Sequence, residues 1–470
     1  AQIFNDYYPL PNNDSIQSTS ENSGINSFVT NSNSTSEQAT LKLDYNFSEA
    51  HVFSFRAFYN QGESNDPWSL PTTDRGTFPY KGHQYSIAMD WTWIVSPTLV
   101  NSFKVAYNRN CAGWFKSNED FDMPFNSLDP TAPESFTTFG GYEGYDDQYR
   151  NTGTLQFKET LTWLKGDHSI KGGVDFRYLH DNSAANFGRV PIYYFDSYFT
   201  GQDYLTNVRT GLVDNLSVTI YGDGTNYISG TEDYRGWRTR EYDLFVQDDW
   251  KVLSNLTLNL GARLEFKPAP FEVNNILGGF MPSDAYNNGY RMPNYNNLFD
   301  PANYTTGEVM DLYNYFWYGA GDDPVNWQGT GATSILASQG YELYNADNFN
   351  LAPRLGLSWD PFGDGKTAVR AGYGISFDRM FDNLVTWTTG QVPYSLPVFM
   401  ATTLGGDGIF PDGVTYYGRG VPMPAVTTHP DPASFLDWVT IFNDDFSQPY
   451  IQTWNLSVQR ELWPGNILNV

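Results

Sequence analysis

The chain has 470 residues, of which only 17% are charged, and a formal net charge of −26. This acidity argues against a nucleic-acid partner, because contacts to phosphates need a basic surface. No apolar run approaches the roughly 18 residues of a transmembrane helix, so a helical membrane protein is excluded. Aromatic residues reach 17% and glycines number 42, a composition that favours β structure.

Cys111 is the single cysteine, so the chain can form no internal disulfide. We interpret it as an incidental small residue at a strand end. The first residues, AQIFNDYYPL, lack the basic and apolar regions of a secretory signal. The chain stops just after a turn, and both ends are therefore expected to be cuts inside a longer protein.

Apolar and polar residues alternate along much of the chain, which predicts strands, because successive side chains of a strand point to opposite faces. Glu159 interrupts the apolar face of its strand. The strands expected in the first half of the chain lie at residues 23–33, 39–47, 51–60, 85–93, 103–107, 155–163 and 170–178.

The hairpin at residues 242–266 shows the alternation most clearly. In its second strand, apolar side chains occupy every even position from Leu256 to Phe266. The odd positions from Thr257 to Glu265 hold polar residues or glycine. The length of this strand falls within the roughly 9–11 residues that a tilted strand needs to cross a membrane.

Short turns alternate strictly with long connections. The remaining strands are expected at 355–359, 369–377, 450–462 and, truncated, after 466. The long connections fall at about 61–80, 112–151, 181–235, 268–350 and 381–449. Roughly 13 strands joined in this way match the outer-membrane pattern of short periplasmic turns and long extracellular loops. We therefore predict an all-β fold, part of an antiparallel transmembrane β-barrel.

An aromatic residue stands just before each of six short turns. Indole rings favour the membrane–water interface, because the ring is apolar and its N–H needs a polar partner. We interpret the six as an aromatic girdle at the short-turn end, and the alternative is that they cap a soluble core. The girdle residues are Phe47, Trp93, Trp163, Trp250, Trp359 and Trp463.

Barrel closure sets a condition on the membrane interpretation. In lipid, an unpaired strand edge leaves backbone groups unsatisfied at several kcal/mol each. A sheet of about 13 strands with two open edges is therefore unstable in a bilayer. Either further strands precede residue 1 and follow residue 470, or the membrane interpretation fails.

Five motifs, in order along the chain, resemble the barrel of TonB-dependent outer-membrane transporters. They are more narrowly similar to the Oar-like branch, which has a carboxypeptidase-regulatory-like front domain and is abundant in Acidobacteria. The motifs are YYPLPNND (7–14) with KLDYNFSEAHVFSFRAFYN (42–60), KGDHSIKGGVDFRY (165–178), FVQDDWKVLSNLTLNLGARLEF (245–266), APRLGLSWDPFGDGKTAVRAGYGISFDR (352–379) and QPYIQTWNLSVQREL (448–462).

The resemblance implies a 22-stranded barrel in the outer membrane of a Gram-negative bacterium. It also implies an N-terminal plug domain, which the inner-membrane TonB complex drives. Residues 1–470 would be a partial barrel of this kind. The sequence departs from the family in lacking the plug, the TonB-contacting segment and the closing strand with its terminal aromatic residue. Energised transport is therefore an expectation for the parent protein.

The polar strand face would line the barrel interior, and we predict a polar wall there. One interpretation is that these charges grip a plug or pass a polar solute. The other is an ordinary solvated surface, because water makes charges inexpensive in a wide lumen. The residues of this polar wall are Lys171, Asp175, Arg177, Arg263, Glu265, Arg354, Arg370 and Asp378.

The long connections carry acidic clusters and many aromatic rings. Close carboxylates and amides could hold Ca²⁺, but we prefer a solvated acidic surface, because charge runs are usually solvated. No other cofactor is expected. The rings could stack on sugars or peptides, or form the cores of the loops. The groups are 119–122, 146–147, 322–323 and 443–445 for the acids, and 142–149, 193–195 and 313–318 for the rings.

No catalytic arrangement emerges from the sequence. The five histidines are scattered without the spacing of a metal site. Gly372-Tyr373-Gly374 lies inside an alternating strand, whereas a phosphate loop needs a following helix. We therefore predict a transport barrel in contact with outer-membrane lipid, a plug, TonB and an unidentified extracellular ligand. A surface-adhesion protein with a barrel anchor and a passive porin are the alternatives.

Overall fold

The structure, a computed structural model, places most of the predicted strands in one antiparallel sheet of 13 strands. It describes residues 32–66, 78–115, 147–184, 192–195, 200–221, 234–274, 349–379, 385, 395–401, 415–416 and 446–470. No helix within these stretches is long and apolar enough to cross a membrane.

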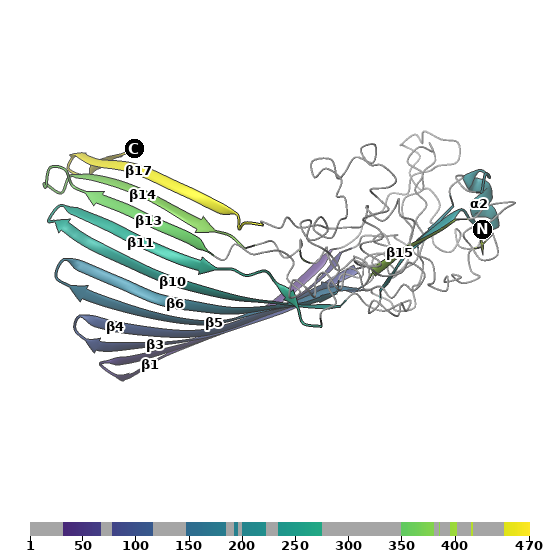
Figure 1. Cartoon of the computed structure of the whole chain (residues 1–470), viewed down its shortest axis with the longest axis horizontal. Coiled ribbons are helices and arrows are strands. Elements are labelled where there is room, and N and C mark those ends of the chain that lie inside the picture. Colours follow the sequence, from purple (N-terminus) through teal and green to yellow (C-terminus); the bar gives the residue numbers. More distant parts are fainter. Residues whose placement is uncertain are drawn as a thin grey trace, which may run out of the picture.

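Each strand of the large sheet pairs with its neighbours in chain order. Figure 1 shows this order from β1 at the bottom to β17 at the top, with the short turns together at the left end. The strands are β1 (Asn33–Ser48), β2 (His51–Asp66), β3 (Phe78–Ser96), β4 (Leu99–Trp114), β5 (Gln148–Lys165), β6 (His168–Ala184), β10 (Arg235–Leu253), β11 (Leu256–Phe266), β13 (Asn350–Trp359), β14 (Thr367–Phe377), β17 (Tyr450–Trp463) and β18 (Asn466–Asn469), while β12 (Phe271–Glu272) pairs with β10.

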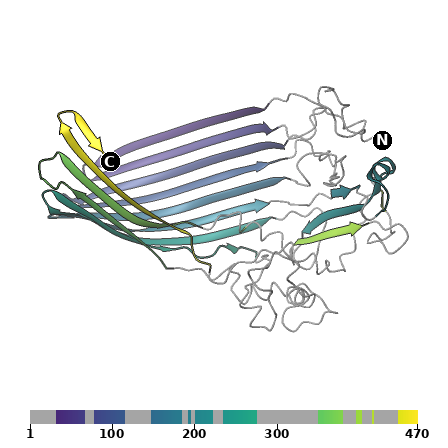
Figure 2. The same cartoon turned by 90° about the horizontal axis from the view of Figure 1, so that it is seen from above.

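Smaller elements lie beyond the other end of this sheet, where Figure 1 shows β15 and α2. One small sheet is formed by β7 (Ile192–Tyr194), β9 (Asn215–Tyr221) and β15 (Ser395–Ala401). Another pairs β8 (Leu212–Val213) with β16 (Thr415–Tyr416), and α2 spans Tyr204–Thr210. Figure 2 shows that the large sheet is curved about an axis that runs along its strands.

Local chemistry explains the short turns. Gly166 joins β5 to β6 with a φ of 59°, and Gly465 joins β17 to β18 with a φ of 82°. Only glycine adopts these angles without strain. Between β13 and β14, the Asp360 carboxylate accepts hydrogen bonds from the N–H groups of Gly363 and Gly365, at 3.0 and 2.8 Å. The sequence therefore encodes each of these reversals locally.

The predicted strands are confirmed, and most are longer than the alternation indicated. β11 has the predicted bounds, whereas β10 begins at Arg235 instead of residue 242. The strand predicted at 23–33 lies outside the described residues except for its last two, and Asn33 opens β1. The 13 strands of the sheet include β12, which the alternation did not indicate. The connection predicted at 181–235 contains α2 and short strands.

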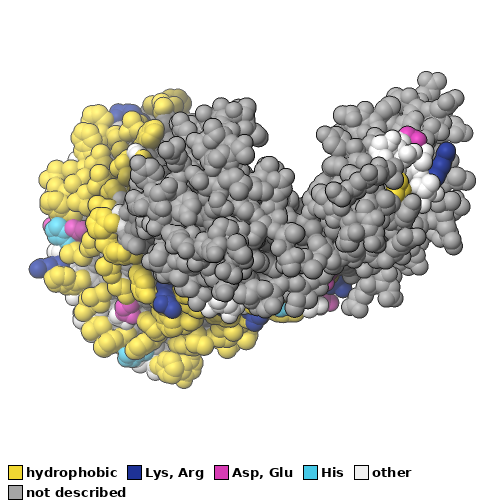
Figure 3. Space-filling model, turned by 45° about the vertical axis from the view of Figure 1, so that its right-hand side comes forward, with side chains coloured by type: hydrophobic (Ala, Val, Ile, Leu, Met, Phe, Trp, Pro, Cys, Tyr) yellow, Lys and Arg dark blue, Asp and Glu magenta, His cyan; other side chains and the backbone are white. Residues whose placement is uncertain are grey.

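The two faces of the sheet differ sharply, and register keeps each face continuous from strand to strand. We call apolar the face with the even positions of β11, and polar the face with its odd positions. On the apolar face, Leu244 is 49% exposed and Val246 is 55% exposed. On the polar face, Asp175 is 3% exposed and Asp243 is 2% exposed. Figure 3 shows the hydrophobic side chains covering the strands on the outside of the molecule. This is the reverse of a water-soluble sheet.

Candidate functional site

Three neighbouring strands bring carboxylates into one row on the polar face. Asp175 of β6 pairs in register with Asp243 of β10, which pairs in turn with Glu265 of β11. Glu241 lies two residues away on the same face of β10. All four residues are buried. Buried carboxylates so close together require cations, because isolated charges are strongly destabilised away from water.

Arg263 of β11 supplies the central cation. Its guanidinium lies 3.1 Å from Glu265 and 3.7 Å from Asp175, and it also donates a hydrogen bond to Asp243. The side chain is 18% exposed. One planar group with several N–H donors thus links carboxylates from three strands, a task that suits guanidinium geometry.

Three further cations complete the arrangement. Arg177 lies 3.2 Å from Asp175 and 3.6 Å from Glu241, and Lys267 lies 2.7 Å from Glu265. Arg379, beyond the end of β14, lies 3.8 Å from Glu241. Four carboxylates therefore face four cations, and the formal charges cancel. We call these eight residues the charged network: Asp175, Glu241, Asp243, Glu265, Arg177, Arg263, Lys267 and Arg379.

An aromatic ring lies on the polar face beside this network. Phe245 has the Lys158 ammonium 5.4 Å from its ring centre and the Arg263 guanidinium 6.0 Å away. Both distances suit cation–π attraction. Gly173 of β6 lies opposite Phe245, and this position requires glycine. A Cβ on Gly173 would lie 2.1 Å from the Glu159 carbonyl oxygen and 2.9 Å from the Phe245 ring. The absence of a side chain at Gly173 therefore lets the Phe245 ring pack against the backbone of β6.

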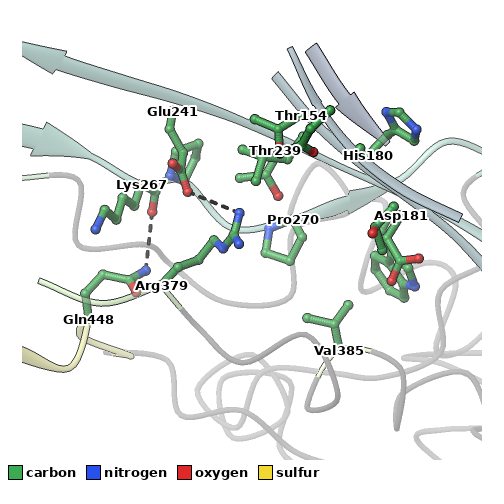
Figure 4. Close-up of a pocket in the computed structure, with 16 residues that line it drawn as sticks. Thr154, His180, Asp181, Thr239, Glu241, Lys267, Pro270, Arg379, Val385 and Gln448 are labelled. Atoms are coloured by element: carbon green, nitrogen blue, oxygen red, sulfur yellow. Dashed lines mark hydrogen bonds and ion pairs between the residues drawn. The ribbon is translucent and has the colours of Figure 1, made fainter. Parts of the chain in front are cut away.

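A cavity of about 150 Å³ opens on the polar face at the long-connection end of the sheet. We call it the inner cavity. Figure 4 shows Glu241, Lys267 and Arg379 of the charged network at one side of it. The residues that line it are Asn108, Thr152, Gly153, Thr154, Leu179, His180, Asp181, Trp237, Thr239, Glu241, Lys267, Pro268, Pro270, Arg379, Val385 and Gln448.

Hydrogen bonds tie three segments together beside the inner cavity. Lys267, just after β11, donates from Nζ to the carbonyl oxygen of Phe377 at the end of β14, at 2.8 Å. Gln448, just before β17, donates from Nε2 to the carbonyl oxygen of Lys267 at 3.4 Å. Figure 4 shows this second bond as a dashed line. The cavity wall is therefore built from strand positions and from residues of the long connections.

Three buried polar atoms at the inner cavity have no hydrogen-bond partner among the described residues. They are Nε1 of Trp237, Oε1 of Glu241 and Oε1 of Gln448. Their residues are only 4%, 3% and 4% exposed, respectively. Buried polar groups are nearly always hydrogen-bonded, so these three atoms are exceptions. The Arg379 guanidinium lies 3.8 Å from Glu241 Oε1, which leaves that oxygen an ionic partner.

The predicted polar wall divides into two halves. Asp175, Arg177, Arg263 and Glu265 meet in the charged network. The other four are exposed and do not join it: Lys171, Arg354, Arg370 and Asp378. Arg370 instead donates a hydrogen bond to Gln459 at 2.6 Å. The role of the eight residues as a lumen wall stays a prediction.

Sequence reasoning missed six residues of the site. Asp243 and Lys267 continue the odd positions of the central hairpin, so the alternation could have indicated them. Glu241 and Trp237 lie in the part of β10 that the predicted strand left out. Arg379 and Gln448 lie outside any strand, where alternation gives no signal.

Five girdle residues lie on the apolar face beside short turns: Phe47, Trp93, Trp163, Trp250 and Trp359. Trp463 also lies beside a short turn, but it follows a register irregularity of β17 after Glu461. Trp250 is half-buried, and its ring stacks on His168 at 5.2 Å between centres. The other five are exposed: Phe47, Trp93, Trp163, Trp359 and Trp463. Their place at a membrane interface stays a prediction.

Two polar contacts interrupt the apolar face near the short-turn end. Asn101 of β4 donates a hydrogen bond to the Glu159 carboxylate of β5, which explains how the face accommodates the acid noted in the sequence. His168 and Asp248 lie 2.6 Å apart between Nδ1 and Oδ2. Both acids therefore have a polar partner in an apolar setting.

The predicted acidic clusters lie outside the described residues, except for Asp147. Among the predicted aromatic groups, Tyr149 belongs to β5, Tyr193 and Tyr194 belong to β7, and Phe195 is buried; 313–318 lies outside the described part. No group of His, Cys, Asp or Glu within the described part could hold a metal ion. The Ca²⁺ hypothesis for the loops is therefore untested.

The fold and its faces together define the class of protein. An antiparallel sheet that exposes leucine and tryptophan and buries charged residues suits lipid on one side and a polar interior on the other. This is the construction of a transmembrane β-barrel. Residues 1–470 match the family model described as an outer membrane beta barrel domain, and the chain belongs to this family. The protein is thus located in the outer membrane.

Several solved structures resemble the chain at low identity. The outer membrane transporter YddB of Escherichia coli is 12% identical with a TM-score of 0.49, over 94% of this chain and 40% of YddB. The ferric-catecholate import receptor Fiu of E. coli K12 is 8% identical with a TM-score of 0.43, over 93% of this chain and 50% of Fiu. The siderophore receptor PiuA of Acinetobacter baumannii is 8% identical with a TM-score of 0.40, over 93% and 49%.

The chain thus spans half or less of the length of these structures. A search of curated protein sequences finds no match.

Proposed function

We propose that the chain forms part of the barrel of a TonB-dependent transporter that imports a ligand across the outer membrane. The family assignment supplies the outer-membrane barrel. The sequence motifs that resemble TonB-dependent transporters, and the Oar-like branch in particular, supply the transport hypothesis. On this proposal the parent protein also has a plug, and residues 1–470 contribute part of a 22-stranded barrel.

The main observation behind this proposal is that the carboxylates of the charged network are buried. Side chains that line an open, water-filled pore are solvated. Here Asp175, Asp243 and Glu265 are 3%, 2% and 8% exposed, although they lie on the polar face. Buried carboxylates that are balanced by neighbouring cations suit a gated transporter better than the solvated wall of a passive porin.

The edges of the sheet support a larger barrel. β1 pairs only with β2 among the described strands, and every residue of β1 is exposed. β18 at the other edge is also fully exposed. Unpaired edges are unstable in lipid at several kcal/mol for each unsatisfied group. We therefore propose that further strands complete the barrel.

Conductance and uptake test the proposal together. The native protein, purified from outer membranes, is expected to leave a planar bilayer closed to ions. Cells that carry it are expected to accumulate their ligand only while the proton gradient is intact, because TonB transmits that energy. A steady open conductance would support a porin. Ligand capture at the surface that persists with a protonophore, without accumulation, would support an adhesion protein.

A further inference from the structure

We propose that three arginines on the apolar face bind the phosphate groups of an anionic lipid headgroup. They are Arg109 of β4 together with Arg238 and Arg240 of β10, and we call them the arginine cluster. All three lie toward the long-connection end of their strands. This inference rests on the location of the chain in the outer membrane, and it does not depend on the transport function proposed above.

Register places two of the arginines on the apolar face of β10. This strand pairs with β6 without a shift from Arg235 to Trp250, so its even positions all share the face of Leu244. Arg238 and Arg240 therefore continue the surface that exposes leucine and valine nearer the short turns.

One row across the strands joins Arg238 to Arg109. Arg238 pairs with His180 of β6, and Gly153 of β5 pairs with both His180 and Arg109. Residues directly opposite each other in an antiparallel pair lie on the same face. The His180 ring lies over Gly153, where a Cβ would be 2.3 Å from His180 Cε1. Arg109 therefore shares the apolar face with the two arginines of β10.

The distance from the girdle places the cluster near the headgroups of one leaflet. Arg240 lies ten residues from Trp250 along β10, and Arg109 lies ten residues from Leu99, which pairs with Trp163. With a rise of roughly 3.3 Å per residue and a tilt of roughly 40°, ten residues cover about 25 Å of membrane. The apolar band of an outer-membrane barrel has about this height. If the girdle marks one interface, the arginine cluster thus lies at the other.

Tyrosines accompany the cluster on the apolar face. Tyr178 pairs with Arg240, and Tyr85 pairs with Arg109 and accepts a hydrogen bond from it at 3.1 Å. Tyr242, two residues from Arg240, is 49% exposed. Tyrosine is enriched at membrane interfaces, because its ring is apolar and its hydroxyl is polar. These side chains support the same interface as the strand lengths.

Neutral groups hold two of the arginines in place. Arg109 donates from Nε to Asn151 Oδ1 at 2.6 Å, and Arg238 donates from Nη1 to Asn182 Oδ1 at 2.8 Å. The two asparagines pair with each other in the next row of the same face. Every hydrogen bond that the cluster makes within the described part of the chain goes to a neutral acceptor. These bonds orient the guanidiniums but do not neutralise them.

Arg240 also has no carboxylate beside it within the described residues. Its guanidinium carbon lies 5.4 Å from the centre of the Phe271 ring, and the residue is exposed. Arg177 and Arg263 of the charged network, by contrast, each face carboxylates. Although the net charge of the chain is −26, the cluster gathers positive charge without an acid. Such a surface attracts anions, and guanidinium geometry suits the oxygens of phosphate in particular.

The apolar face makes a lipid the source of that phosphate. Toward the girdle, the rows next to the cluster hold the rings of Phe157 and Phe176, which lie 6.2 Å apart, and Phe157 is 37% exposed. An anionic lipid can place its phosphate against the arginines while its acyl chains cover these rings. A soluble phosphate ester has no part that suits them.

Titration of the native protein with lipids tests the inference. The protein is purified in dodecylmaltoside, freed of lipid and mixed with diphosphoryl lipid A, phosphatidylglycerol or zwitterionic phosphatidylcholine, and bound lipid is counted by native mass spectrometry. At least one of the two anionic lipids is expected to bind about tenfold more tightly than phosphatidylcholine. Arg240→Gln should weaken that binding roughly three- to tenfold, and replacing all three arginines by glutamine should remove the preference.

Arg354→Gln is the matched control, because Arg354 is an exposed arginine of the polar face and its loss changes the net charge equally. It should leave the lipid affinity unchanged. The inference is overturned if phosphatidylcholine binds as tightly as both anionic lipids, or if Arg240→Gln has no larger effect than Arg354→Gln. Resistance to heat unfolding on a gel shows whether each variant is folded, and the single variant Arg240→Gln decides the matter if the triple variant is not.

Glucosamine 6-phosphate tests the other source of phosphate. This water-soluble ester is expected not to displace a bound anionic lipid when both are present at similar concentrations, because it lacks acyl chains. Displacement under these conditions would assign the arginine cluster to a soluble phosphate ester and overturn the lipid assignment.

Discussion

At the scale of single residues, Arg263 holds the buried carboxylates of the polar face together. Replacing it by methionine keeps much of the side-chain volume but leaves Asp175, Asp243 and Glu265 short of a cation. Removing one partner from a buried ionic group is strongly destabilising. We expect Arg263→Met to lower the free energy of unfolding by about 3 kcal/mol, measured by urea unfolding of the native protein in lipid vesicles.

Arg354→Met is the control for this change. Arg354 pairs in register with Gly261 on the same face, but it is exposed. Its replacement should alter stability by less than about 0.5 kcal/mol. Equal effects of the two substitutions would show that the charged network has no special role in stability.

Gly173 tests how closely the ring of Phe245 approaches the backbone. A Cβ at this position would lie 2.1 Å from the Glu159 carbonyl oxygen, whereas at Gly172 the nearest atom would be 3.4 Å away. Gly173→Ala should therefore destabilise the protein by about 1–3 kcal/mol, and Gly172→Ala should be tolerated. The same urea titration measures both, and a tolerated Gly173→Ala would contradict the described contact.

At the scale of strands, the contact between Asn101 and Glu159 joins β4 to β5 on the apolar face. Asn101→Leu alone leaves a carboxylate without its donor and should destabilise the barrel by about 1–3 kcal/mol. Replacing both residues by leucine removes the polar groups together and should be nearly neutral or stabilising.

A double-mutant cycle by urea unfolding measures this coupling. Additive effects of Asn101→Leu and Glu159→Leu would show that the two side chains do not depend on each other. A double variant less stable than Asn101→Leu alone would also contradict this account.

The strands also show how far alternation alone can predict the fold. β11 has its predicted bounds, because its apolar and polar residues alternate without a break. β10 extends to Arg235, beyond the predicted start, since its first residues are held by pairing with β6 and β12 rather than by a pattern of their own. Pairing partners far along the chain are invisible to a local pattern.

The candidate site was predicted only in part for the same reason. Arg263 and Glu265 could be found from their alternation in β11, and they do meet in the charged network. Arg379 and Gln448 reach the inner cavity from outside the strands, so their contribution depends on where the long connections enter and leave the sheet. Trp237 was missed because its part of β10 was assigned to a connection.

At the scale of the whole molecule, the sheet is a wall with two opposite surfaces. Leucine, valine and tryptophan are exposed on one surface, while the buried carboxylates of the charged network lie on the other. Figures 1 and 2 show that the strands run side by side along this wall from the short turns to the long connections. We therefore assign lipid to the apolar face and the interior of the barrel to the polar face.

A cysteine scan of β11 tests this assignment most directly. Cys111→Ser removes the one thiol of residues 1–470, and single cysteines then replace residues from Thr257 to Leu264 in turn. Each carries a fluorophore in the native protein, reconstituted in vesicles, and is quenched either by doxyl groups on the lipid tails or by iodide in the water. We expect strong lipid quenching at Leu258, Leu260, Ala262 and Leu264, and weak lipid quenching at the odd positions between them. Uniform quenching along the strand, or lipid contact at the odd positions, would contradict it.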